Sequence, residues 1–148
     1  MKKLIYLFAI AAFTITSCSK DAETITVDSS KPDGAFTVSK SGAFVAQSST
    51  PTVGMAQLGM DSKGVQFLKF SSDFTTQFAT GTVSVYLSTS MTWVPDPGNS
   101  QGNLRLIGPA LKAGETYYKL DPKADAKFTH VILWCGTAGV PFGNAAIK

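Results

Sequence analysis

The sequence predicts an all-β domain, built as an antiparallel β-sandwich of the jelly-roll or immunoglobulin-like kind or as a partly closed barrel. Short segments of alternating apolar and polar residues recur roughly every ten residues. Gly, Pro, Asn and Asp, which favour turns, separate these segments. Beyond the first residues, no long segment shows the 3.6-residue period of an amphipathic helix. We therefore expect no long helix in the mature domain.

The first half of the domain contains four expected strands. Two short ones are expected at Gly34–Val38 and Gly42–Ala46. The next two form a predicted hairpin, with strands Val53–Met60 and Val65–Phe70 joined by the turn Asp61–Gly64. After this hairpin, Phe74 and Phe78 are four residues apart, which fits a single helical turn or a loop packed on the core.

The second half continues the same pattern. Thr82–Ser88 alternates, and its valines and Leu87 are expected to face inward. Leu104–Ile107 is a further expected strand, and Leu111–Leu120 is expected to form a turn and a strand. Asp121–Asp125 begins as a helix does, with Asp at the N-cap and Pro at the first helical position, but spans only about one turn.

Composition restricts the class of protein. Hydrophobic residues make up 44% and charged residues 16% of the chain, which excludes a disordered protein. Of the 13 basic residues, Lys2 and Lys3 belong to the leader described next, so the remaining basic residues nearly balance the 10 acidic ones. A near-neutral domain has no electrostatic attraction for nucleic acid, and we expect no such partner.

The chain begins like an exported protein. Two lysines precede the apolar segment Leu4–Phe13, which has the length of a signal peptide and is too short to span a bilayer. Ile15–Cys18 then resembles the lipobox of bacterial lipoproteins. The predicted organisation is a signal peptide at 1–17, a lipidated flexible tether at 18–33 and a single β domain at 34–148.

The lipobox resemblance implies that Cys18 carries lipid and anchors the protein in the outer membrane of the cell envelope. Several acyl chains would hold it stably, because each buried methylene contributes ~0.8 kcal/mol. The Lys-Asp step within Ser19–Glu23 resembles a short signal that sends lipoproteins to the cell surface. The alternative is plain secretion, with Cys18 as a free or paired thiol.

The segment Phe128–Gly143 contains the only histidine and the second cysteine. If Cys18 is lipidated, Cys135 has no partner in the chain. Within this segment, Val131–Trp134 is apolar on both faces, which predicts a buried central strand. Strand alternation directs His130 away from Cys135, which opposes a Cys–His nucleophile pair. Glycines that follow are expected to end the strand and leave the thiol at the rim of the sheet.

The irregular segment Ser88–Gly102 is the other candidate site, since loops of this length are usually functional or disordered. Trp93 within it is expected either to contact a ligand or to fold back over the sheet. The sequence has no nucleophile elbow, phosphate loop, dinucleotide fingerprint or redox Cys pair, and a single His and Cys cannot make an ordinary structural zinc site. We therefore do not expect a stand-alone enzyme or a metal site.

The C-terminal motif resembles that of a known family. The run Val131–Cys135, followed by Phe142-Gly143 and Ala145, resembles the signature of the DM-thirteen domain, a small all-β domain proposed to act in extracellular electron transfer. The similarity extends over residues 34–148, through Gly34–Phe36, Val83–Leu87, Ile107–Leu111, Gly114 and Tyr118–Leu120. Ala138 is a departure, because the family often has an aromatic residue there.

The resemblance implies that Cys135 is a redox thiol or a ligand to a prosthetic group such as haem, with Trp134 and Phe142 beside it. A second haem ligand would then be His130, Met55, Met60 or Met91. The first functional hypothesis is therefore an electron-transfer domain whose partner is a redox protein. The second is a cell-surface binding or adhesion module that uses the 88–102 loop, with Trp93 and either Tyr117 or Tyr118 against a glycan or protein and Cys135 structural.

Overall fold

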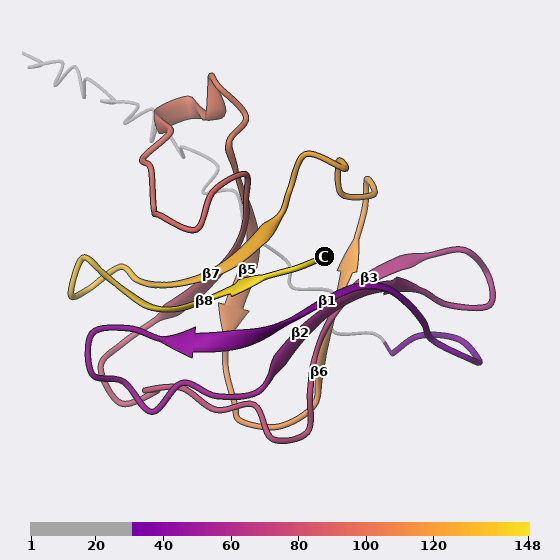
Figure 1. The fold of residues 1–148 in the computed structure, drawn as a ribbon, viewed down its shortest axis with the longest axis horizontal. Coiled ribbons are helices and arrows are strands. Elements are labelled where there is room, and N and C mark those ends of the chain that lie inside the picture. Colours follow the sequence, from indigo (N-terminus) through magenta and orange to yellow (C-terminus); the bar gives the residue numbers. More distant parts are fainter. Residues whose placement is uncertain (1–30) are drawn as a thin grey trace, which may run out of the picture.

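A computed structural model describes residues 31–148 (Figure 1). The predicted signal peptide, the lipobox, Cys18 and most of the tether lie outside the described residues. Within 31–148, no helix has the length and apolar character needed to cross a membrane.

The described chain is all-β, as predicted, and its strands are antiparallel. They pair in the order β5-β4-β7-β8-β1-β2-β3-β6. Their bounds are β1 Thr37–Ala46, β2 Met55–Met60, β3 Gln66–Phe70, β4 Val83–Ser88, β5 Leu104–Ala110, β6 Thr116–Leu120, β7 His130–Cys135 and β8 Val140–Ala146. A short 3₁₀ turn, η1, spans Pro97–Asn99 between β4 and β5.

Strand β1 joins the two halves of the sheet. Its first part, Thr37 to Ala43, pairs with β2, and its last part, Phe44 to Ala46, pairs with β8. The sequence predicted two strands here, and this prediction was wrong, because Gly42 lies inside one continuous strand. A Cβ at Gly42 would lie 2.0 Å from the Ala146 carbonyl oxygen, so this glycine allows close packing rather than a break.

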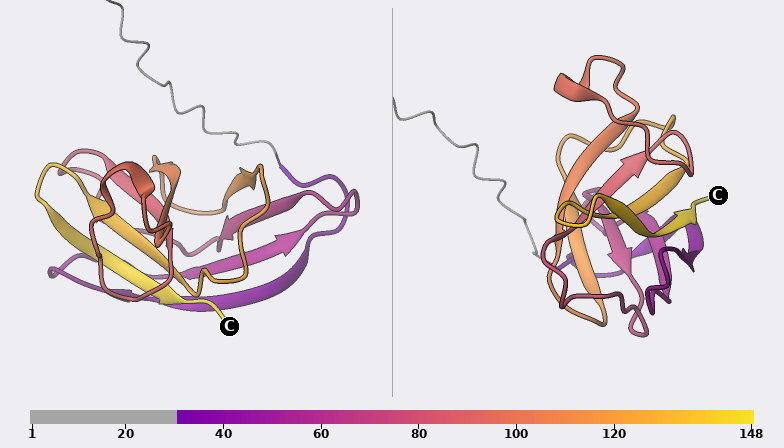
Figure 2. Two further views of the ribbon diagram at one scale, coloured as in Figure 1. Left: turned by 90° about the horizontal axis from the view of Figure 1, so that it is seen from above. Right: turned by 90° about the vertical axis from the view of Figure 1, so that its left-hand side faces the viewer.

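The two outer strands of the sheet, β5 and β6, come together on one side of the molecule (Figure 2). They are not joined by a ladder of backbone hydrogen bonds. Instead, the Tyr118 hydroxyl on β6 donates to the Pro109 carbonyl on β5 at 3.2 Å. The sheet is therefore a nearly closed barrel, which agrees with the predicted fold class.

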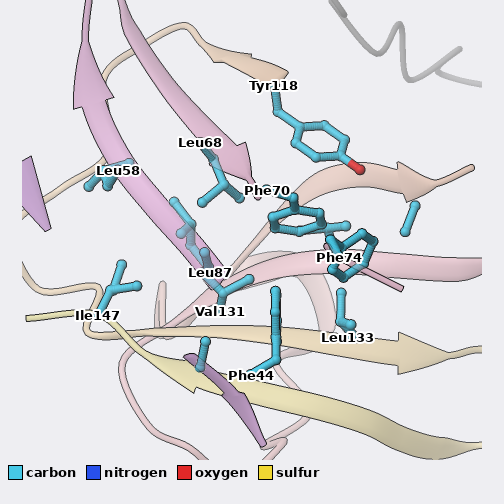
Figure 3. Close-up of a cluster of buried hydrophobic side chains, with 14 of the residues drawn as sticks. Phe44, Leu58, Leu68, Phe70, Phe74, Leu87, Tyr118, Val131, Leu133 and Ile147 are labelled. Atoms are coloured by element: carbon cyan, nitrogen blue, oxygen red, sulfur yellow. The ribbon is translucent and has the colours of Figure 1, made fainter. Parts of the chain in front are cut away.

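The core fills the inside of this curved sheet, as Figure 3 shows. Phe44, Phe70 and Phe74 meet there, with ring centroids 4.4 to 5.4 Å apart. Phe74 lies in the loop after β3 and packs on the core, which is one of the two predicted arrangements. The inward residues of β4 and β7 are fully or almost fully buried: Val83, Val85, Leu87, Val131, Leu133 and Cys135.

Two other elements differ from the prediction. Asp121–Asp125 forms no helix, and the segment is fixed instead by the Gln66 side chain, which accepts a hydrogen bond from the Ala124 amide at 2.6 Å. Strand β8 was not predicted, because Pro141 and Gly143 interrupt its strand pattern. The pairing register shifts between Leu133 and Trp134 of β7, which pair with Gly143 and Pro141, so Phe142 is the extra residue of a bulge in β8.

Candidate functional site

The outer face of β7 carries the aromatic site. Trp134 points outward from β7, and Trp93 from the 88–102 loop stacks on it, with ring centroids 4.3 Å apart and an interplanar angle of 12°. Tyr86 on the neighbouring strand β4 meets Trp93 edge-on at 4.6 Å and 79°. The loop therefore folds back over the sheet. This confirms the prediction that Trp93 covers the sheet, which was one of the two made for this residue.

Ile132 shows that this outer face is covered. It lies on β7 between His130 and Trp134, on the side opposite the core, and its cross-strand partner is Tyr86. Although it is not part of the core cluster, its side chain is 0% exposed. The aromatic groups and the loop thus form a second apolar layer outside the barrel.

Asp96 organises the end of the loop. Its carboxylate accepts hydrogen bonds from the backbone amides of Gln101 at 3.1 Å and Asn103 at 3.2 Å. The hydrogen bond from Gln101 is the main reason that the pKa of Asp96 is lowered. The loop segment around η1 is the one that rises at the top of Figure 1, and Asp96 ties it to the start of β5.

A pocket of about 510 Å³ opens between this loop and the strands β4 and β5. Tyr86 and Trp93 supply its aromatic surface, and prolines of the loop border it. Its lining consists of Tyr86, Trp93, Pro95, Asp96, Pro97, Asn99, Leu104, Arg105 and Leu106. A concave, mostly apolar site with a few polar groups is the usual form of a ligand pocket. Trp93 therefore covers the sheet and also lines a pocket, and its contact with a ligand stays a prediction.

Cys135 lies on the opposite side of β7. Its side chain is 0% exposed and belongs to the core cluster. Its thiol donates a long hydrogen bond to the Thr80 carbonyl oxygen, with 3.9 Å between the sulfur and the oxygen. Cys135 does end its strand, as predicted, but the thiol points into the core and not to an accessible rim, because the inward positions of β7 face the phenylalanine cluster.

Only one of the two residues proposed beside Cys135 lies on its side of the sheet. Phe142 is 4% exposed and belongs to the same core cluster as Cys135, whereas Trp134 projects from the other face of the sheet. His130 is on that outer face too, where burial, together with the positive charge of Lys148, lowers its pKa. Its Nδ1 lies 2.9 Å from the Thr129 hydroxyl.

The arrangement does not fit haem. Met55 and Met60 on β2 are 38% exposed and Met91 in the loop is 62% exposed, so none of them faces the buried thiol as a second axial ligand. Among residues 31–148, no group of three or more His, Cys, Asp or Glu side chains could hold a metal ion.

The Phe142-Gly143 motif has a structural explanation. The Phe142 carbonyl accepts hydrogen bonds from the Thr50 hydroxyl at 2.6 Å and the Thr52 hydroxyl at 2.8 Å. A Cβ on Gly143 would approach the Thr52 methyl to 2.8 Å. The motif therefore fixes β8 against the Thr50–Thr52 segment, and Ala138 is an exposed residue of the β7–β8 turn.

Sequence reasoning missed Tyr86, Asp96 and the β5 side of the pocket. Tyr86 was visible as an outward residue of an alternating strand, but nothing in the sequence paired that strand with β7. The Asp-Pro step at Asp96 was a turn signal, yet its role depends on amides five and seven residues further along the chain.

Comparison with known proteins adds no relative. No family model, curated protein or solved structure matches this chain. The DM-thirteen resemblance therefore stays a prediction.

Proposed function

We propose that this protein is a carbohydrate-binding module and that the pocket under the 88–102 loop is its binding site. The observation that carries the proposal is the pairing of Trp93 with Tyr86 at the wall of a pocket of about 510 Å³. A sugar ring presents an apolar C–H face and a polar rim. Aromatic rings match the face, and neighbouring polar groups match the rim.

The site is also preorganised, which favours binding. Trp93 is held by its stack on Trp134, and the Asp96 carboxylate fixes the loop by accepting backbone amides. A ligand that enters would therefore not have to order these groups, and the entropic cost of binding would be small.

The test is isothermal titration of the purified protein against a panel of soluble neutral and acidic polysaccharides. We expect at least one to bind, and Trp93→Ala to weaken that binding at least tenfold, because it removes the main apolar contact. Tyr117→Ala is the matched control. Tyr117 is likewise partly buried and aromatic, contacting Phe36 edge-on at 6.0 Å, but it lies on β6 and is not part of the lining of the pocket.

Two results would count against the proposal. The first is that no member of the panel binds. The second is that Trp93→Ala and Tyr117→Ala weaken binding equally, since this would mean that the site lies elsewhere or that the loss is global. If only a polypeptide partner binds, and Trp93→Ala weakens that binding, then the ligand is a protein, the other class that the sequence predicted, and not a glycan.

The electron-transfer role of Cys135 and the lipid anchor at the cell surface stay predictions. For a redox role, the core would have to open, because the thiolate is the reactive form of cysteine and Cys135 is buried among apolar side chains. The geometry supports the binding role better, since the pocket already reaches solvent on the opposite face.

A further inference from the structure

The second depression on this face lies beside the first. Its volume is about 240 Å³, and it is lined by Thr82, Ser84, Leu106, Gly108 and Pro109. Leu106 lines both depressions, and its side chain is 38% exposed between them. The two therefore adjoin across a single side chain.

The strand register places both depressions along one line. Tyr86 pairs with Leu106, and Ser84 pairs with Pro109, so the outward residues of β4 and β5 follow one another from the loop toward Thr82. At ~3.3 Å per residue, the four steps from Tyr86 to Thr82 cover roughly 13 Å. This length exceeds one sugar ring and suits a short linear chain.

Tyr86 connects the two depressions. Its ring lines the first, and Ser84, two residues away on the same face of β4, lines the second. The surface thus changes along its length from aromatic rings at Trp93 to the hydroxyls of Ser84 and Thr82.

The chemistry of the second depression is neutral. It has no charged side chain in its lining, and its polar side chains are the two hydroxyls. In the first depression, the Asp96 carboxylate is already occupied by loop amides, and Arg105 is the one cationic side chain of the lining, so the second depression is the part of the surface that disfavours a charged chain. A neutral chain rich in hydroxyl groups matches such a surface, whereas a charged chain would find no partner in the second depression.

We infer that the ligand is a neutral linear oligosaccharide that lies along β4 and β5, with one sugar ring at Trp93 and Tyr86 and the next units over Leu106 at Ser84 and Thr82. This inference rests on the proposed carbohydrate-binding function and specifies its ligand class. Leu106 then contacts the chain between the two subsites.

The experiment compares chain lengths. Glucose and the cello-, malto-, xylo- and manno-oligosaccharides of two to six units are titrated against the purified protein. We expect one series to bind, with affinity rising at least tenfold between the shortest ligand that binds and the tetramer, and then levelling once both subsites are filled.

Two substitutions, used together in one double variant, test the second depression alone, which is the second subsite for the oligosaccharide. Thr82→Val keeps the shape and removes one hydroxyl, and Ser84→Ala removes the other. We expect the double variant to reduce tetramer affinity at least fivefold and leave the shortest binding ligand unchanged. Trp93→Ala should weaken both. Thermal melting of the double variant within a few degrees of the wild type would show that the fold is retained.

The inference is overturned if affinity does not depend on chain length, if the double variant changes nothing, or if no series binds. In the last case, the proposed function still stands when an acidic polysaccharide of the wider panel binds and Trp93→Ala removes that binding. It falls only if the whole panel fails.

Discussion

Gly42 shows how one residue permits the junction of the two halves of the sheet. It lies in β1 next to the point where pairing passes from β2 to β8, and a Cβ there would meet the Ala146 carbonyl oxygen at 2.0 Å. A backbone atom cannot move aside as the end of a side chain can. The space is therefore available to glycine alone.

Gly42→Ala should accordingly destabilise the protein by about 2–3 kcal/mol, near the upper range for overpacked sites. Gly136→Ala is the control, since a Cβ at Gly136 meets no atom within 4 Å and its backbone is not left-handed. This control should stay within ~0.5 kcal/mol of the wild type. Urea unfolding measures both, and equal effects of the two would contradict the close contact.

Cys135 is the residue for which sequence and structure suggest different roles. As a core residue, its thiol should react with a disulfide reagent only after denaturation. The chain has two cysteines, so the measurement is made on a Cys18→Ser variant, in which Cys135 is the only thiol. Rapid reaction of the native protein would instead support the redox prediction.

Cys135→Ser tests the same burial by stability. The thiol hydrogen-bonds the Thr80 carbonyl oxygen at 3.9 Å, a distance that is too long for a hydroxyl in the same place to make a good hydrogen bond. We expect a loss of about 1–3 kcal/mol in the free energy of unfolding. A neutral effect in thermal or urea unfolding would show that the site is wetter than its burial indicates.

At the scale of the element, the 88–102 loop depends on one ionised carboxylate. Backbone amides, that of Gln101 first, lower the pKa of Asp96 below its ordinary value. A lowered folded-state pKa contributes stability above the ordinary carboxyl pKa, and this stability is lost as pH falls through the lowered value. The loop should therefore release Trp93 in acid.

The fluorescence of Trp93 and Trp134 measures this release. We expect a change below about pH 4, the ordinary range of a carboxyl group. Asp96→Ala should show the acid-type spectrum already at neutral pH, whereas the exposed Asp121→Ala should not. An acid transition that persists unchanged in Asp96→Ala would assign it to another group.

The strands that the sequence could predict are those whose pattern of apolar residues lies within the strand itself. The alternation of Val83, Val85 and Leu87 fixed the inward face of β4, and the double apolar face of Val131–Leu133 indicated a central strand. Strand β8 was not predictable in this way, because Pro141 and Gly143 are tolerated only through a bulge and a close contact with Thr52. Both depend on residues distant in sequence.

For the whole molecule, the fold class followed from periodicity, but the site did not. The pocket needs β4, β5 and the loop between them to adjoin the outer face of β7, and strand order is not encoded in the alternation of any one strand. Trp93 could be predicted as a candidate because it is aromatic in a long loop. Its partners Trp134 and Tyr86 could be found only from the pairing of β4 with β7.

The closure of the barrel gives a last prediction. Tyr118 is 2% exposed, its hydroxyl joins β6 to β5, and burial raises its pKa well above the ordinary value. A raised folded-state pKa means that the unfolded chain loses its proton first as pH rises. The stability contributed by Tyr118 is therefore complete below the ordinary tyrosine pKa of ~10 and declines above it.

Tyr118→Phe separates the two contributions of this side chain. At neutral pH we expect a loss of about 0.5–1.5 kcal/mol, because the Pro109 carbonyl loses its donor while the ring remains in the core. Above pH 10 the difference from the wild type should shrink. The wild type loses stability there because Tyr118 ionises in the unfolded chain, whereas the variant has no phenol at this position. Urea unfolding at pH 7 and pH 11 measures both. A gap of constant size would mean that other groups cause the alkaline decline, and no gap at pH 7 would mean that the hydroxyl does not help to close the barrel.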